Sequence, residues 1–139
     1  MKHQASPADL DFLRDFEACR VAAEDFDHAA HVRLAYIYLC EHSVDAATER
    51  MKQSLLAFLG HLGVGPAKYH ETITRAWVMA VAHFMRRSEP CASAEAFMAG
   101  SPQLLDSKIM LTHYSAEVLF SPAAREFFVA PDIQEIPRS

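Results

Sequence analysis

Two histidines, His28 and His31, lie three residues apart in the segment FDHAAHVRLAYIYL. A helix places residues i and i+3 on the same face, one turn apart, so both imidazoles would meet the same neighbours. The segment is otherwise strongly apolar, and a buried imidazole needs a hydrogen-bond partner, a charged partner or a metal ion. The pair therefore predicts a functional site in the core, although it names no reaction.

Two further histidines are predicted to face the interior from other helices. In a helix over 66–87, His70 would share its face with the apolar residue Trp77. In a helix over 107–120, His113 would lie next to Glu117, because residues four apart are neighbours on a helical face. Helices would thus direct histidines, and one carboxylate, toward a common interior.

Imidazoles that converge between the helices of a bundle are typical ligands of first-row transition metals. Catalytic zinc keeps three protein ligands and an open position, and two histidines with one carboxylate are an iron(II) arrangement. We therefore expect His28, His31 and His70 to bind one metal ion (iron, copper or zinc), and we expect no nucleotide cofactor. His113 or Glu117 would be a further ligand or a partner that orients a ligand.

Glu71 follows His70 and is the candidate general acid or base if this metalloprotein is an enzyme. A surface ion pair with Arg75, four residues later, is the simpler explanation of this carboxylate. Iron or copper would indicate oxygen chemistry, whereas zinc would indicate hydrolysis or lyase chemistry. The chain contains no Glu-x-x-His and no His-Glu-x-x-His segment, which argues against a di-iron carboxylate centre and a zincin-type protease.

Two alternatives need no metal. In the first, the histidines line an apolar pocket of a binding module and hydrogen-bond a polar or anionic small molecule, with residues 63–69 as a mobile lid. In the second, the protein is structural or mediates an interaction, and its histidines bond to backbone carbonyls. An exposed apolar patch would then mediate binding or a homodimer contact, with Tyr36, Ile37, Phe127 and Phe128 as its candidates.

Composition limits the class of protein. The chain has 139 residues, about half of them apolar, and a net charge of -5. Its Lys and Arg residues are scattered, which argues against nucleic acid, and the one doublet, Arg86-Arg87, is typical of a helix C-terminus. Without a signal-peptide region or an apolar run of about 18 residues, we expect a soluble cytoplasmic protein that does not bind membranes. Three widely spaced cysteines argue against a disulfide framework and a thiolate zinc site.

The apolar spacing predicts an all-α fold, a single-domain bundle of about five or six helices. Glycine is scarce, and no stretch alternates long enough for a sheet. Ser-Pro pairs at 6–7, 101–102 and 121–122 mark helix starts. The expected helices cover 7–18, 26–42 (central), 44–61, 66–87 and 107–120, with short ones near 94–99 and from 122, and an extended tail from about 130.

Three segments together resemble a known group of sequences: FDHAAHVRLAYIYL, KYHETITRAW and LTHYSAEVLFSPAAREFFVAPD. They resemble an uncharacterised family of small bacterial helical proteins with a His-x-x-His segment and a later Tyr-His-Glu-Thr segment. The resemblance covers roughly residues 12–132. It implies that His28, His31, His70, Glu71 and Thr72 occupy the motif positions of that family, and it implies no particular activity.

Overall fold

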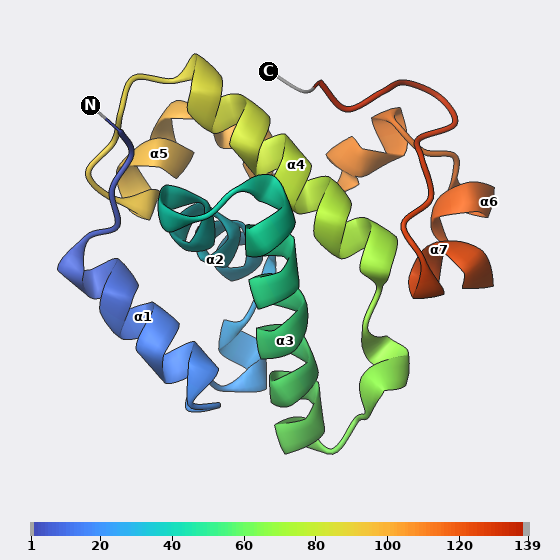
Figure 1. Ribbon diagram of the computed structural model, residues 1–139, viewed down its shortest axis with the longest axis horizontal. Helices are drawn as coiled ribbons and strands as arrows, with labels where there is room; N and C mark the ends of the chain where they lie inside the picture. The colour runs from blue at the N-terminus through green and yellow to red at the C-terminus, as the bar shows by residue number, and fades with distance from the viewer. Residues whose placement is uncertain (1, 138–139) are drawn as a thin grey trace.

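The predicted all-α class is confirmed. The computed structural model describes residues 2–137, and every regular element in that range is helical (Figure 1). The α-helices are α1 (Pro7–Glu17), α2 (His28–Glu41), α3 (Val44–Leu62), α4 (Glu71–Arg87), α5 (Ala94–Gly100), α6 (Ala116–Leu119) and α7 (Pro122–Glu126). Short 3-10 turns are η1 (Ala23–Asp25), η2 (Pro66–Lys68), η3 (Pro102–Leu105) and η4 (Ser107–Thr112).

Helix starts follow the serines as predicted, with one exception. The hydroxyls of Ser6, Ser43 and Ser121 accept backbone N–H bonds at the first turns of α1, α3 and α7, which satisfies donors that a helix leaves unpaired. Ser101 precedes only the 3-10 turn η3 and makes no such capping bond. A Ser-Pro pair therefore identifies the start of a helical turn, while the surrounding packing decides how far the helix continues.

Helix α2 is central, as its apolar composition predicts. It contacts α1, α3, α4 and α5, and Figure 1 shows it enclosed among them. Val32, Leu34 and Tyr36 are fully buried, and Ile37 is 3% exposed. The prediction that Tyr36 and Ile37 belong to an exposed interaction patch is therefore wrong, because this helix is covered on nearly every side.

The predicted helix over 107–120 is not continuous. The turn η4 ends at Thr112, and α6 begins only at Ala116. Between them, the Ser115 backbone N–H donates to Asp132 Oδ1 (2.8 Å) and the Tyr114 hydroxyl donates to Val129 O (2.6 Å). The Ser115 N–H thus bonds to the C-terminal tail in place of a helical carbonyl, and the Tyr114 side chain adds a second bond to the tail. From 127 to 137 the tail contains no helix.

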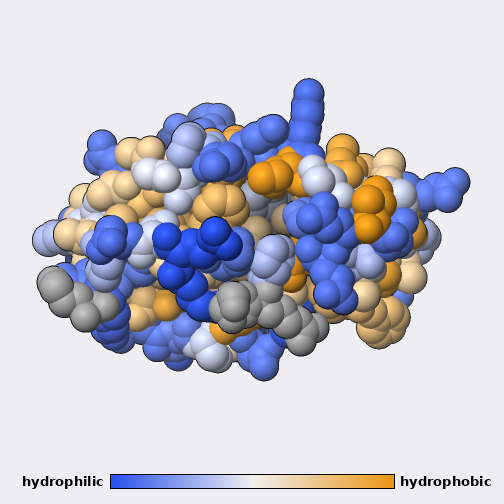
Figure 2. Space-filling view, turned by 90° about the horizontal axis from the view of Figure 1, so that it is seen from above, coloured by the Kyte–Doolittle hydropathy of each residue, from blue (hydrophilic) through white to orange (hydrophobic). Residues whose placement is uncertain are grey.

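Exposed apolar side chains gather in the C-terminal third of the chain. Phe120 and Phe127 are 57% and 67% exposed, and Phe128 and Ile133 are also exposed. In the view from above, apolar residues are interspersed with hydrophilic ones at the surface (Figure 2). Within residues 2–137, no helix is long and apolar enough to cross a membrane.

Candidate functional site

His28 is the first residue of α2. The helix begins there because Asp27 Oδ1 accepts the Ala30 N–H at 2.9 Å. The imidazole of His28 reaches out of the helix: its Nε2 donates to the carbonyl of Leu104 at 2.8 Å, and its ring meets Trp77 edge to face with 4.5 Å between ring centroids. His28 therefore ties η3 to the central helix.

His31 lies one turn further along and is partly buried. Its ring is nearly parallel to that of His28, with 6.5 Å between the centroids, and its edge faces Phe26. Burial, and secondly the neighbouring His28, lower the pKa of His31 from 6.5 to about 4. The imidazole is therefore neutral at physiological pH.

His70 does not lie inside a helix, as the sequence predicts, but caps one. Residues 66–68 form only a 3-10 turn, and the extended His70 backbone is followed by α4. His70 Nδ1 accepts the Ile73 N–H (3.1 Å), and Nε2 donates to Leu119 O (2.7 Å). The two bonds require the ring proton on Nε2, and burial lowers the pKa of His70, so the ring is a buried neutral tie between α4 and α6.

His113 and Glu117 are not the helical neighbours that the sequence predicts, because the helix between them is interrupted. His113 Nδ1 donates to Gln134 O at 2.8 Å. Glu117 belongs to α6 and is exposed. The interrupted helix thus leaves His113 attached to the C-terminal tail.

Glu71 has other partners than Arg75. Its Oε1 accepts the Tyr69 hydroxyl at 2.9 Å and lies 3.7 Å from Lys52 Nζ. Arg75 instead donates to Asp45 Oδ1 at 2.7 Å. The predicted Glu71–Arg75 pair is therefore wrong: at the first position of α4, the Glu71 carboxylate turns toward the preceding segment and α3.

The structure brings together only His28 and His31 among the predicted ligands. His70 bonds to α6, and His113 bonds to the tail. Among residues 2–137, no group of three or more His, Cys, Asp or Glu side chains is arranged to hold a metal ion. Metal binding remains a prediction, and the three-histidine geometry on which it was based is not formed.

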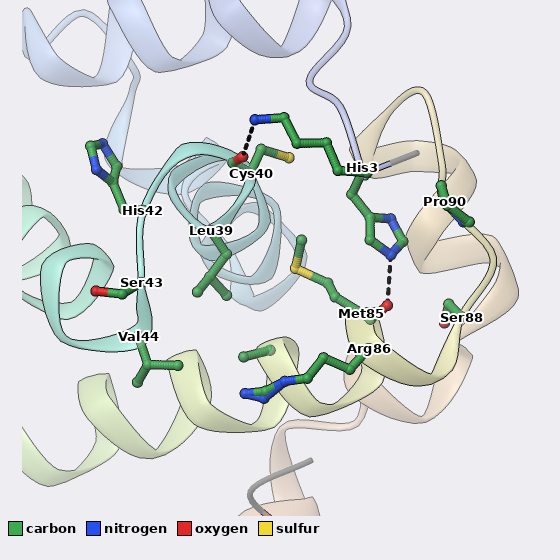
Figure 3. A pocket seen from close by; sticks show the side chains of 12 residues that line it. His3, Leu39, Cys40, His42, Ser43, Val44, Met85, Arg86, Ser88 and Pro90 are labelled. Atoms are coloured by element: carbon green, nitrogen blue, oxygen red, sulfur yellow. Dashed lines mark hydrogen bonds between the residues drawn. The ribbon is translucent and has the colours of Figure 1, made fainter.

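A cleft lies at the other end of α2. Its volume is about 520 Å³, and it opens between the end of α2, the start of α3, the last turns of α4 and the N-terminal segment (Figure 3). We call it the Arg86 cleft. It is lined by Lys2, His3, Leu39, Cys40, His42, Ser43, Val44, Ala82, Met85, Arg86, Ser88 and Pro90.

One wall of the Arg86 cleft is held by His3. Its Nε2 donates to Met85 O at 2.7 Å, and its Nδ1 accepts the Cys91 N–H at 3.1 Å. The preceding residue, Lys2, donates from Nζ to Cys40 O at 3.4 Å. The N-terminal segment is thereby fixed across the ends of α2 and α4, so the cleft is formed by segments that are far apart in the sequence.

Two cationic side chains, those of Lys2 and Arg86, line the Arg86 cleft. The Arg86 side chain extends from α4 toward Val44 (Figure 3), and the N-terminus of α3 adds the positive end of its dipole. Lys2 lies 3.7 Å from Glu41, but both side chains are about 70% exposed, so water screens the pair. Among the described residues, no Asp or Glu lines the cleft.

Cys40 gives the cleft no nucleophile. Burial, the largest effect, raises the pKa of this thiol to about 11, so it remains protonated at neutral pH. With a protonated thiol, apolar walls and cationic side chains, the Arg86 cleft is suited to binding an anion. The sequence alone does not reveal the Arg86 cleft, because Arg86 is equally explained as a residue of a helix C-terminus. Lys2 belongs to no motif that would mark it as part of a site.

The structure is that of an all-α protein with a cleft, lined by two cationic side chains, beside its central helix. Comparisons with known protein families, curated proteins and solved structures give no match to this chain. The resemblance to a family of small bacterial helical proteins remains a prediction.

Proposed function

We propose that this protein is a binding protein for a small amphipathic anion, which it takes up in the Arg86 cleft. The observation that carries this proposal is the combination of Lys2 and Arg86 with no carboxylate in the lining of the described cleft. Its volume of about 520 Å³ lies within the range of about 300–1,000 Å³ that is usual for small-molecule sites.

The lining defines the chemistry of the ligand. The guanidinium of Arg86 presents N–H donors in a planar fork, which suits a carboxylate, sulfonate or phosphate group. Leu39, Val44 and Met85 supply apolar surface around it. A ligand that joins an anionic group to an apolar body would satisfy both parts of the lining.

The contacts of three histidines favour a structural role over metal catalysis. Those at positions 3, 28 and 70 each donate from Nε2 to a backbone carbonyl of a distant segment. His70 has both ring nitrogens engaged, so ligation of a metal would break a helix cap or the tie to α6. These bonds to backbone carbonyls are the arrangement expected for the second metal-free alternative, in which the histidines are structural, and they leave the Arg86 cleft as the place for a ligand.

Replacing Arg86 with Gln is expected to weaken octanoate binding at least 10-fold. Octanoate joins a carboxylate to an apolar chain, and a charge-assisted hydrogen bond contributes about 1.5–3 kcal/mol, which corresponds to about 10–100-fold in affinity. Isothermal titration calorimetry of the full chain would measure the dissociation constant.

Arg87 provides the matched control. It is exposed at the neighbouring position of α4 and does not line the cleft. Arg87→Gln makes the same change in net charge and should alter the dissociation constant by less than about twofold, since surface charge beyond the site is largely screened. The proposal would be abandoned if the wild-type chain bound no octanoate at millimolar concentration, or if both variants weakened binding equally.

A metal site at the His28–His31 pair is a second candidate, and one observation favours it. Metal-bound histidines usually donate their other ring N–H to a carbonyl or carboxylate, and His28 Nε2 donates in this way to Leu104. Its Nδ1 and the neutral His31 ring are then the candidate ligands, with water completing the coordination. Because the nearly parallel rings are 6.5 Å apart, binding would require a change of side-chain rotamer.

Copper is the probe of this second candidate, because Cu²⁺ binds nitrogen ligands most tightly among the divalent first-row metals. We expect one equivalent of Cu²⁺ per untagged chain by calorimetry, and a loss of at least 10-fold in affinity for His31→Ala. His61→Ala removes an exposed histidine of α3 and should change the affinity less than twofold. Equal affinity of the two variants would exclude the His28–His31 site.

A further inference from the structure

A second cleft adjoins the Arg86 cleft. Its volume is about 550 Å³, and it shares Ser43, Val44 and Arg86 with the first. Beyond these shared residues it is lined by Asp45, Arg75, Met79, Phe128 and Pro137, and we call it the Phe128 cleft. The two clefts therefore lie on either side of the Arg86 side chain, along the same face of α4.

The Phe128 cleft contains a charge that is already paired. Arg75 Nη2 donates to Asp45 Oδ1 at 2.7 Å, and the Arg75 guanidinium lies over the Phe128 ring, 5.5 Å from its centroid. The carboxylate of Asp45 would also repel a second anion. This cleft is consequently unsuited to an anionic group, and the apolar surfaces of Met79 and Phe128 are what it offers to a ligand.

The distance between the two regions sets the length of the ligand. Met79 and Arg86 are seven residues apart on α4, which corresponds to about 10 Å along the helix axis. An anionic group at Arg86 thus leaves room for an elongated body that reaches Phe128. The aliphatic part of the Arg86 side chain would cover such a body while its guanidinium stays at the anion.

We propose that the ligand is a long-chain carboxylate that spans both clefts, with its anionic group at Arg86 and its apolar end against Met79 and Phe128. This inference rests on the anion-binding function proposed above. A ligand that spans both clefts should bind with an affinity that increases with its chain length. Its affinity should also depend on Phe128, which is remote from the charged group.

The experiment measures butyrate, octanoate and dodecanoate binding to the full chain by calorimetry, each below its micelle concentration. Dodecanoate should bind at least 10-fold more tightly than octanoate, because each buried methylene adds favourable transfer free energy. Phe128→Ala should weaken dodecanoate at least fivefold and change butyrate less than twofold. Phe127→Ala is the matched control: its ring is 67% exposed and does not line the cleft, so both ligands should be unaffected.

The outcomes separate this inference from the proposed function. Binding that depends on Arg86 but is independent of chain length, or equally affected by Phe127→Ala and Phe128→Ala, would overturn the two-cleft ligand and leave the proposed anion site intact. The absence of any Arg86-dependent binding would overturn both.

Discussion

Replacing Asp9 with Ala is expected to reduce the free energy of unfolding by about 2–5 kcal/mol, because two backbone N–H donors lose their acceptor and each unpaired buried donor costs about 1–3 kcal/mol. Asp9 is 2% exposed. Its Oδ1 accepts from Arg33 Nε at 3.0 Å, and its Oδ2 accepts the N–H groups of Ala94 (2.8 Å) and Ser6 (3.0 Å). One carboxylate therefore joins α1, α2 and α5, and its loss leaves the two N–H donors without an acceptor, whereas Arg33 keeps its contact with the Phe12 ring and its exposure to water.

Urea-induced unfolding would measure this effect. Asp11→Ala is the matched control, because Asp11 lies on the same helix and its ion pair with Arg14 leaves both side chains 68% exposed. Such a pair contributes about 0.2–1 kcal/mol. Equal shifts for the two variants would contradict the central role of Asp9. Burial alone would raise the pKa of Asp9, but the bonds from Ala94, Ser6 and Arg33 lower it below 3.8. The contribution of the Asp9 carboxylate to the free energy of unfolding is therefore lost only at a more acidic pH.

Local signals in the sequence were sufficient to predict most of the helices. Serine hydroxyls at positions 6 and 43 cap α1 and α3, and the continuous apolar composition of α2 marks the central helix. These features act within one or two turns of the backbone, so they can be identified without knowledge of the rest of the chain.

Non-local bonds decide the elements that the sequence predicts wrongly. His70 would lie inside a helix if the helix began at Pro66, but its bond to Leu119 and its capping of Ile73 favour an extended backbone. Similarly, Asp132 takes the Ser115 N–H and interrupts the stretch 107–120. His70 and His113 lie outside the helices in which they were predicted, so the argument from helical faces does not apply to them. The convergence of metal ligands that was predicted from those faces is consequently not formed.

The two clefts could not be predicted from the sequence for a different reason. Lys2, Ser43 and Arg86 are each explained by a local role, as a terminal residue, a helix cap and a helix C-terminus. The cleft that they line together forms only when Lys2 and His3 fix the N-terminal segment across the ends of α2 and α4. No spacing rule joins such residues, so the site cannot be identified before the fold is known.

Three histidines have a common structural role, and two of them, His28 and His70, were predicted to be metal ligands. His3, His28 and His70 each connect a segment to a backbone carbonyl that is 82, 76 and 49 residues away. An imidazole suits this role, since its ring packs against apolar neighbours while its N–H satisfies a carbonyl that the core would otherwise leave unpaired. The interior histidines are therefore explained by the segments that they hold together. Their burial also makes the stability of the fold depend on pH.

Acidification is expected to destabilise the protein by up to about 3 kcal/mol through His31 alone, since its pKa falls from 6.5 when unfolded to about 4 when folded. A lowered pKa in the folded state means that the unfolded chain binds the proton more readily. The contribution is therefore complete above pH 6.5, decreases as the pH falls toward 4 and is absent below that value. Burial also lowers the pKa of His70, which acts in the same direction.

Unfolding free energies from urea titrations at pH 7, 6, 5 and 4 would test this expectation. His31→Leu retains an apolar contact with Phe26 and removes the proton-binding group, so the loss of stability between pH 6.5 and 4 should shrink by about 2–3 kcal/mol. His61→Gln removes a histidine that is exposed on α3 and should leave the pH dependence as in the wild type. An unchanged slope for His31→Leu would show that His31 gains access to water in the folded protein, and the assignment of the acid sensitivity to this ring would then be wrong.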